Sequence, residues 1–210
     1  MDLYDPQRFS SDFHDLIAWI NGMKTLVCSD ELATDETGAE VLLERHQVLK
    51  AEIEDHAGSF QTFEAFGNQL LQSDQYASPE IQEKLDELAQ ERKDLDKHWS
   101  DRHLKLMDSY DLQRFLSNFH DLMAWINGMK TLVCSDELAK DVNGAEVLLV
   151  RHQELKAQIE TQAGSFQTFA GSFQACETLG KKLLHIHHYA SPEIQEKLKE
   201  LAQVQEDLDK

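Results

Sequence analysis

The chain has 210 residues and carries 39 acidic against 20 basic residues, a net charge of −19 at pH 7. This charge excludes nucleic acid and anionic lipid surfaces as natural partners, because their phosphates would be repelled. Only nine glycines and three prolines are present, which favours long helices over a β fold. No apolar run reaches the roughly 18 residues of a membrane span, and the N-terminus has no signal-peptide pattern.

The first predicted helix begins at Asp5-Pro6, because proline is tolerated where a helix starts. Its apolar residues alternate between spacings of four and three, which is the heptad pattern of a helix packed against other helices. This seam consists of Phe9, Phe13, Leu16, Ile20, Met23 and Val27, with Trp19 beside it.

A second predicted helix follows, and Thr37 with Glu40 fits a capping box at its start. Its seam runs unbroken through Leu42, His46, Leu49, Ile53, His56, Phe60, Phe63, Gly67 and Leu70. The third predicted helix starts at Ser78-Pro79. Its seam consists of Ile81, Leu85, Leu88, Arg92, Leu95 and Trp99. Three such seams predict a three-helix bundle.

The chain then repeats this unit. The phrase "RFSSDFHDLIAWINGMKTLVCSDELA" at Arg8 recurs almost unchanged at Arg114, an offset of 106 residues. "YASPEIQEKL" at Tyr76 recurs at Tyr189, an offset of 113. The two offsets differ by seven because "AGSFQTF" at 57–63 is followed in the second unit by a near copy, "AGSFQTFAGSFQAC" at 163–176. In the second unit Asn143 is the expected helix cap.

The junction between the units lacks a helix breaker. The position that corresponds to Pro6 in the second unit is Leu112, and no proline occurs from Glu80 to Cys134. A proline inside a helix costs about 3 kcal/mol, so its loss predicts one continuous helix over residues 79–136. We expect domains at 1–108 and 109–210. The second ends at Lys210, the counterpart of Lys97, so its third helix is truncated and lacks a residue equivalent to Trp99.

These motifs together resemble spectrin repeats. The unit of 106 residues, the Trp within "AWI", the "LLERHQ" of the second helix and the Trp of the third carry the resemblance, and "CSDELA", "GAEVLLERHQ" and "YASPEIQEKL" are most similar to repeats of the spectrin alpha chain. The resemblance implies an all-α fold of two tandem left-handed three-helix coiled-coil bundles joined by a continuous helix. Repeats in that family usually differ more than these two, and we interpret the chain as a fragment or as an engineered or recently duplicated pair.

The sequence offers few candidates for chemistry. The histidines His185, His187 and His188 could suggest zinc, but no further ligand stands at helical spacing, so we interpret them as polar residues at a helix end. The seam histidines His46 and His152 are interpreted as hydrogen-bonded within the bundle. The acidic stretch 29–36 lacks calcium-loop spacing and is interpreted as a solvated loop.

The remaining residue types point to packing. The phenylalanines are interpreted as core residues: Phe60, Phe63, Phe66, Phe166, Phe169 and Phe173. The three cysteines contain no C-x-x-C pair and favour a reducing, intracellular setting. Cys28 and Cys134 are either surface thiols or small buried residues. We therefore expect no catalytic, cofactor-binding or metal-binding residues, and no enzymatic activity.

The expected function is that of an elastic structural spacer that offers helix faces to other proteins. The alternative is an interaction module that docks one specific partner on one helical face. By the resemblance, the partners are a spectrin beta chain and the actin-based membrane skeleton, and the location is cytoplasmic.

The heptad insertion near 170–176 changes the facing of a helix by only about 20°. We expect it to stay helical and to lengthen the second helix, with Phe173, Cys176, Gly180 and Leu183 continuing the seam. We further expect the turn at 185–191 to move outward and the third helix to slide by one heptad along residues 106–115.

Overall fold

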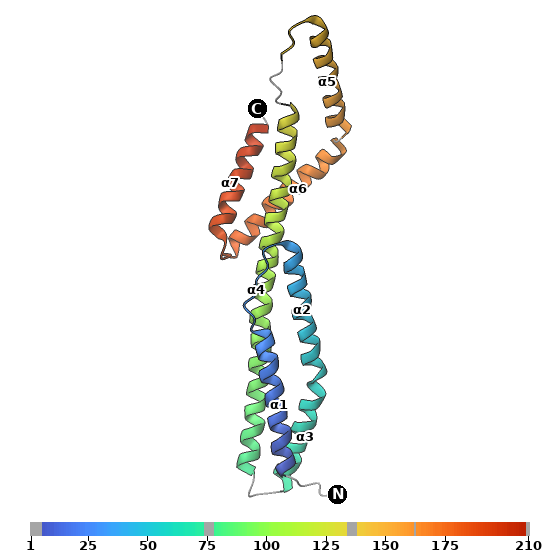
Figure 1. Ribbon diagram of the computed structural model, residues 1–210. Coiled ribbons are helices and arrows are strands. Elements are labelled where there is room, and N and C mark those ends of the chain that lie inside the picture. The colour runs from blue at the N-terminus through green and yellow to red at the C-terminus, as the bar shows by residue number, and fades with distance from the viewer. Residues whose placement is uncertain (1–5, 74–77, 134–137, 162, 209–210) are drawn as a thin grey trace. The chain divides into compact units, whose positions relative to one another are not determined.

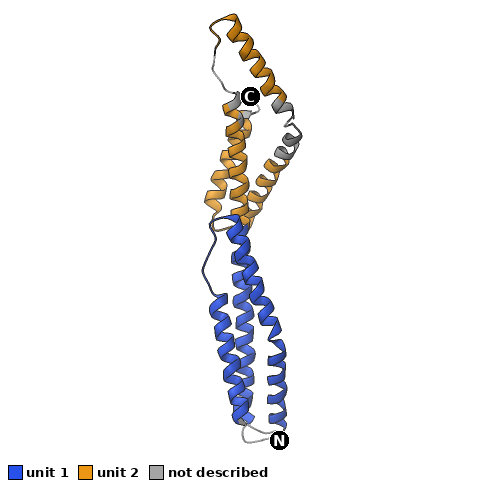
Figure 2. Ribbon diagram, turned by 45° about the vertical axis from the view of Figure 1, so that its right-hand side comes forward, with its two compact units in different colours: residues 1–110 blue, residues 111–210 orange. Residues whose placement is uncertain are grey.

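The computed structural model describes residues 6–73, 78–133, 138–161 and 163–208, and every regular element in these ranges is an α-helix (Figure 1). The helices are α1 Pro6–Val27, α2 Glu36–Asp55, α3 Ala57–Ser73, α4 Ser78–Val133, α5 Val142–Thr161, α6 Ala163–His185 and α7 Ser191–Leu208. The chain divides into two compact units, unit 1 of residues 1–110 and unit 2 of residues 111–210 (Figure 2). The all-α fold class is confirmed.

The boundary between the units falls inside α4, so one helix contributes to both. This helix has 56 residues, which corresponds to about 84 Å at 1.5 Å per residue. Leu112, the position that proline would have broken, is buried within it. The predicted continuous helix is therefore confirmed up to Val133, and its predicted end at 134–136 lies outside the described residues.

The core of unit 1 is built from the three predicted seams. Phe9 of α1 stacks on Phe63 of α3 with ring centroids 4.4 Å apart. The other fully enclosed apolar residues are Phe13, Ile20, Met23, Val27, Phe60, Leu70, Ile81, Leu88 and Leu95. The seam residue Arg92 lies at the edge of this core, where its guanidinium sits 4.5 Å from the centre of the Phe60 ring and pairs with Glu64 at 2.8 Å.

The second predicted helix of unit 1 is interrupted, so the expectation of one unbroken helix is wrong at His56. Here α2 ends and α3 begins, and the backbone of His56 adopts φ −77° and ψ −8°. The amide of His56 still donates to the Glu52 carbonyl at 3.3 Å, and the Ser59 amide donates to the His56 carbonyl at 3.0 Å. The Trp19 ring stacks on the His56 imidazole at 3.8 Å, which fixes this residue where Gly58 weakens the helix.

The predicted helix caps are also corrected. The Asp35 carboxylate, two residues before Thr37, accepts from the Gly38 amide at 2.7 Å. Asp141 makes the same contact with the Gly144 amide at 2.7 Å, two residues before Asn143. A carboxylate before the first turn accepts from a free amide and also favours the positive end of the helix. The aspartates therefore displace Thr37 and Asn143 from the capping role.

Unit 2 has a core formed by α4, α6 and α7, and α6 is one helix across 170–176, as predicted for its backbone. Phe173 is 9% exposed, Cys176 0%, and Gly180 and Leu183 are buried, which confirms the described part of the predicted seam. The side chains of Phe166 and Phe169 lie outside the described residues.

A close glycine contact sets the register of both cores. A Cβ placed on Gly67 would come within 3.0 Å of the Phe9 ring and 2.8 Å of Leu85. A Cβ on Gly180 would come within 2.8 Å of the Phe115 ring and 2.9 Å of Leu198. Gly180 and Leu198 follow their counterparts by 113 residues, and Phe115 follows Phe9 by 106.

The expectation that α7 slides by one heptad is therefore wrong, since the register of unit 1 is kept. Phe173 takes the place of Phe60 and Cys176 the place of Phe63, so residues 170–176 occupy the position of 57–63. Residues 163–169 are then the additional heptad. If α6 were shifted by one heptad, Phe173 would stand at the position of Gly180, where no side chain fits beside Phe115. The added length is accommodated on the side of α5.

Candidate protein-protein interface

In unit 1, α2 is closed against α4 by a reciprocal pair of hydrogen bonds. His46 Nε2 donates to the Trp99 carbonyl at 3.0 Å, and Trp99 Nε1 donates to the His46 carbonyl at 3.1 Å. The two rings stack with centroids 4.8 Å apart. His46 is only 4% exposed, so the prediction that it is hydrogen-bonded within the bundle is confirmed. Burial of the imidazole lowers its pKa.

The counterpart in unit 2 is arranged differently. His152 is exposed, so the prediction that it lies within a bundle is wrong. The physical reason lies in the stack and the paired hydrogen bonds with Trp99, which enclose His46 in unit 1. Ala145 is exposed as well, whereas its counterpart Ala39 is buried. Among the described residues, α5 contributes none of the core residues of unit 2.

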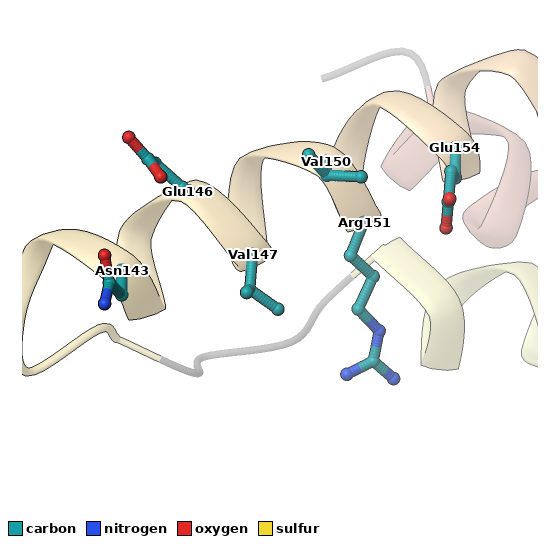
Figure 3. Close-up of a pocket in the computed structure, with 6 residues that line it drawn as sticks. All are labelled: Asn143, Glu146, Val147, Val150, Arg151 and Glu154. Carbon is teal, nitrogen blue, oxygen red and sulfur yellow. The ribbon is translucent and has the colours of Figure 1, made fainter.

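On its outer side, α5 presents apolar side chains to solvent. Val147 is 67% exposed and Val150 53% exposed, and Val150 stands where unit 1 has Glu44. A hollow of about 690 Å³ lies along this helix. Figure 3 shows the side chains of Val147 and Arg151 on the same side of α5. The hollow is lined by Asn143, Glu146, Val147, Val150, Arg151 and Glu154. We call these six residues the α5 face.

Sequence reasoning missed the α5 face, although a signal was present. The substitution of Glu44 by Val150 adds an apolar residue on the outside of a helix. The counterparts of all six residues in unit 1 are exposed on α2, so the α5 face is the outer side of this helix.

The three histidines near the end of α6 do not form a metal site. His185 ends the helix, His187 adopts a positive φ of 55°, and His188 is buried with its Nδ1 accepting from the Ala190 amide at 3.1 Å. The His188 ring also contacts the Tyr189 ring, with centroids 4.2 Å apart and ring planes tilted by 36°. In the described part of the chain, no group of three or more His, Cys, Asp or Glu residues is placed to hold a metal ion.

The cysteines, the acidic stretch 29–36 and the phenylalanines are the other candidates. Cys28 is exposed just after α1, Cys134 lies outside the described residues, and Cys176 is buried. Burial raises the pKa of Cys176 to about 11, so its thiol stays protonated at neutral pH. The acidic stretch 29–36 forms the connection between α1 and α2 and the first residue of α2. Phe60 and Phe63 are buried and Phe66 partly so, as core packing requires.

The fold and this surface define a class: tandem helical bundles that share a helix and act through their surfaces. The family model described as "Spectrin repeat" matches residues 4–108 and 110–210. The chain belongs to the spectrin repeat family. Among the residues that the structure describes, no helix has both the length and the apolar character needed to cross a membrane.

Curated relatives carry the same family name. The chain is 30% identical over 198 residues to mouse "Spectrin alpha chain, erythrocytic 1", which covers 94% of this chain and 8% of that protein. It is 31% identical over 152 residues to human "Spectrin beta chain, non-erythrocytic 5", covering 72% of this chain and 4% of that protein. It is 29% identical over 166 residues to mouse "Spectrin beta chain, erythrocytic". The chain thus spans less than a tenth of the first two relatives.

Proposed function

We propose that this chain is a structural scaffold of the cytoskeleton, a load-bearing spacer without catalytic activity at the cytoplasmic membrane skeleton. The observation that carries the proposal is α4, which supplies buried residues to both cores. Because neighbouring units of a repeat array share such an element, loss of one affects the stability of the next. By family membership we include a spectrin beta chain and actin-based filaments among its partners.

Mechanical stretching of the single chain between two handles tests the spacer. Each unit of about 100 residues should release roughly 350 Å of contour length when it unfolds, at about 3.5 Å per residue. Discrete unfolding events of this size, followed by refolding on relaxation, are the expected result. Smooth extension without discrete events would contradict a load-bearing role.

A second function is favoured by the exposed His152 and Ala145 on the other side of α5, namely docking of a partner helix. The counterpart of His152 in unit 1, His46, is covered by the part of α4 that carries Trp99, and two hydrogen bonds join the two helices there. A partner helix with a tryptophan at that position would bury His152 and Ala145 in the same way. Buried aromatic anchors commonly dominate the binding energy of such contacts.

A labelled peptide of residues 92–110 is a suitable probe for docking, read by fluorescence anisotropy. We expect saturable binding to the chain and loss of binding when Trp99 of the peptide is replaced by Ala. Ala145→Glu, which places a charge on the docking side of α5, should weaken binding, and Val150→Glu, on the opposite side of the same helix, is the matched control. Equal binding by the chain and both variants would exclude this side of α5 as the docking site.

A further inference from the structure

Unit 1 contains a cluster of two histidines and a tryptophan that neither the spacer function nor the docking function requires. His46, Trp99 and His103 lie with their ring planes within 13° of one another, and each pair of ring centroids is 4.8 to 5.8 Å apart. The cluster joins α2 to α4. Among the described residues, His103 Nδ1 is the one buried side-chain nitrogen or oxygen without a hydrogen-bond partner.

The surroundings of this cluster oppose added positive charge. Arg102, itself buried, lies beside His46 and donates to the Glu31 carbonyl of the connection between α1 and α2. On α2, Lys50 sits 5.1 Å from the centre of the Trp99 ring and pairs with Asp96 of α4 at 3.2 Å. On α1, Lys24 pairs with Glu91 of α4 at 2.5 Å. Glu91 and Asp96 are thus each paired with a lysine.

We propose that the His46–Trp99–His103 cluster is a proton-sensitive contact, which holds α2 against α4 while His46 is neutral and releases it when mild acid protonates the imidazole. The neutral imidazole of His46 carries one N–H, which donates to the Trp99 carbonyl. A second proton would bring a cation into a buried site beside Arg102 and His103. A proton on His103 Nδ1 would bury a donor without an acceptor.

The direction of the effect follows from linkage. Burial, the first cause, lowers the pKa of His46 from 6.5 in the folded state; the hydrogen bond to the Trp99 carbonyl opposes this shift, and His103 and Arg102 add smaller lowering contributions. The open state therefore binds the proton more readily, and the closed state is favoured above pH 6.5 and loses this advantage as the pH falls below it. Between pH 7.5 and pH 5.5, one such histidine increases the open fraction by at most about tenfold.

Hydrogen exchange of the Trp99 indole N–H measures the opening directly, because this proton is held by the His46 carbonyl. We expect its protection factor, corrected for the intrinsic effect of pH on exchange, to fall from pH 7.5 to 5.5, by at most about tenfold. In His46→Gln, which keeps a donor but cannot titrate, the protection factor should not depend on pH. His152→Gln, at the exposed counterpart, should retain the full response of the parent.

An unchanged protection factor in the parent would overturn the proposal, and so would a response that persists in His46→Gln. Should that variant fail to fold, NMR titration of the parent decides. An imidazole of His46 that titrates below 6.5 supports the contact, and one that titrates at 6.5 or above overturns it. Because the readout is confined to unit 1, it is independent of the α5 face.

Discussion

Gly180 lies so close to Phe115 that a Cβ on the glycine would approach the phenyl ring to 2.8 Å. Gly67 and Phe9 stand in the same relation in unit 1. Since Phe115 is fully buried, its ring has no free space into which to move. These two glycine–phenylalanine contacts set the register between the helices of each unit.

Gly180→Ala should therefore destabilise unit 2, by about 1–3 kcal/mol for an overpacked core site. Gly171→Ala on the same helix is the matched control, because nothing lies within 4 Å of its Cβ position. That control should instead stabilise the helix by about 0.5–1 kcal/mol. Urea unfolding followed by circular dichroism measures both. If both substitutions changed the free energy of unfolding in the same direction, the result would contradict the register set by Gly180.

Cys176→Phe should stabilise unit 2 by about 1–2 kcal/mol of added apolar burial and ring stacking. Cys176 occupies the place of Phe63, which stacks on Phe9 within otherwise matching surroundings. The reciprocal change, Phe63→Cys, should destabilise unit 1 by about 2–4 kcal/mol. Thermal unfolding is the measurement. A destabilised Cys176→Phe would show that 170–176 does not reproduce the packing of 57–63.

His187→Gly should stabilise unit 2 by about 1 kcal/mol, because His187 has a left-handed backbone that favours glycine. The amides of His187 and His188 donate to the Leu184 and Leu183 carbonyls, which is the Schellman pattern at the end of α6. His185→Gly, at the last residue of the helix, is the control and should not stabilise. Comparison of urea midpoints distinguishes the two, and no gain at 187 would contradict the assigned backbone strain.

Leu112→Pro should break α4 and separate the unfolding of the two units. A proline in a helix interior costs about 3 kcal/mol or more. Leu112→Ala, which removes the same buried side chain but keeps the helix, controls for packing. We expect two calorimetric transitions for the proline variant and one for the alanine variant. Calorimetric traces of identical shape would rule out coupling through α4.

Unit 2 should be the less stable unit, because α5 is largely exposed and contributes none of the described core residues of unit 2, whereas α2 of unit 1 is held on α4 through His46 and Trp99. Native-state hydrogen exchange should be faster in 142–157 than in 36–51, and faster in 192–208 than in 79–95. Adding residues 98–106 after Lys210 should slow exchange in α5, and a scrambled extension provides the control.

The sequence by itself determined the helices, because heptad seams such as Phe9 to Val27 are a local periodic signal. It also determined the continuous α4, since the presence or absence of proline at 112 acts within one turn. The family followed from repeated motifs. In each case the decisive residues are neighbours along the chain.

Only the tertiary structure decided what depends on contacts between helices. A heptad preserves the facing of a helix, so the sequence could not tell which copy of "AGSFQ" occupies the core, and Gly180 against Phe115 selects 170–176. The capping role of Asp35 and the break at His56 depended on competition between nearby groups. The different surroundings of His46 and His152, which share the same motif, depended on whether a tryptophan from another helix reaches them.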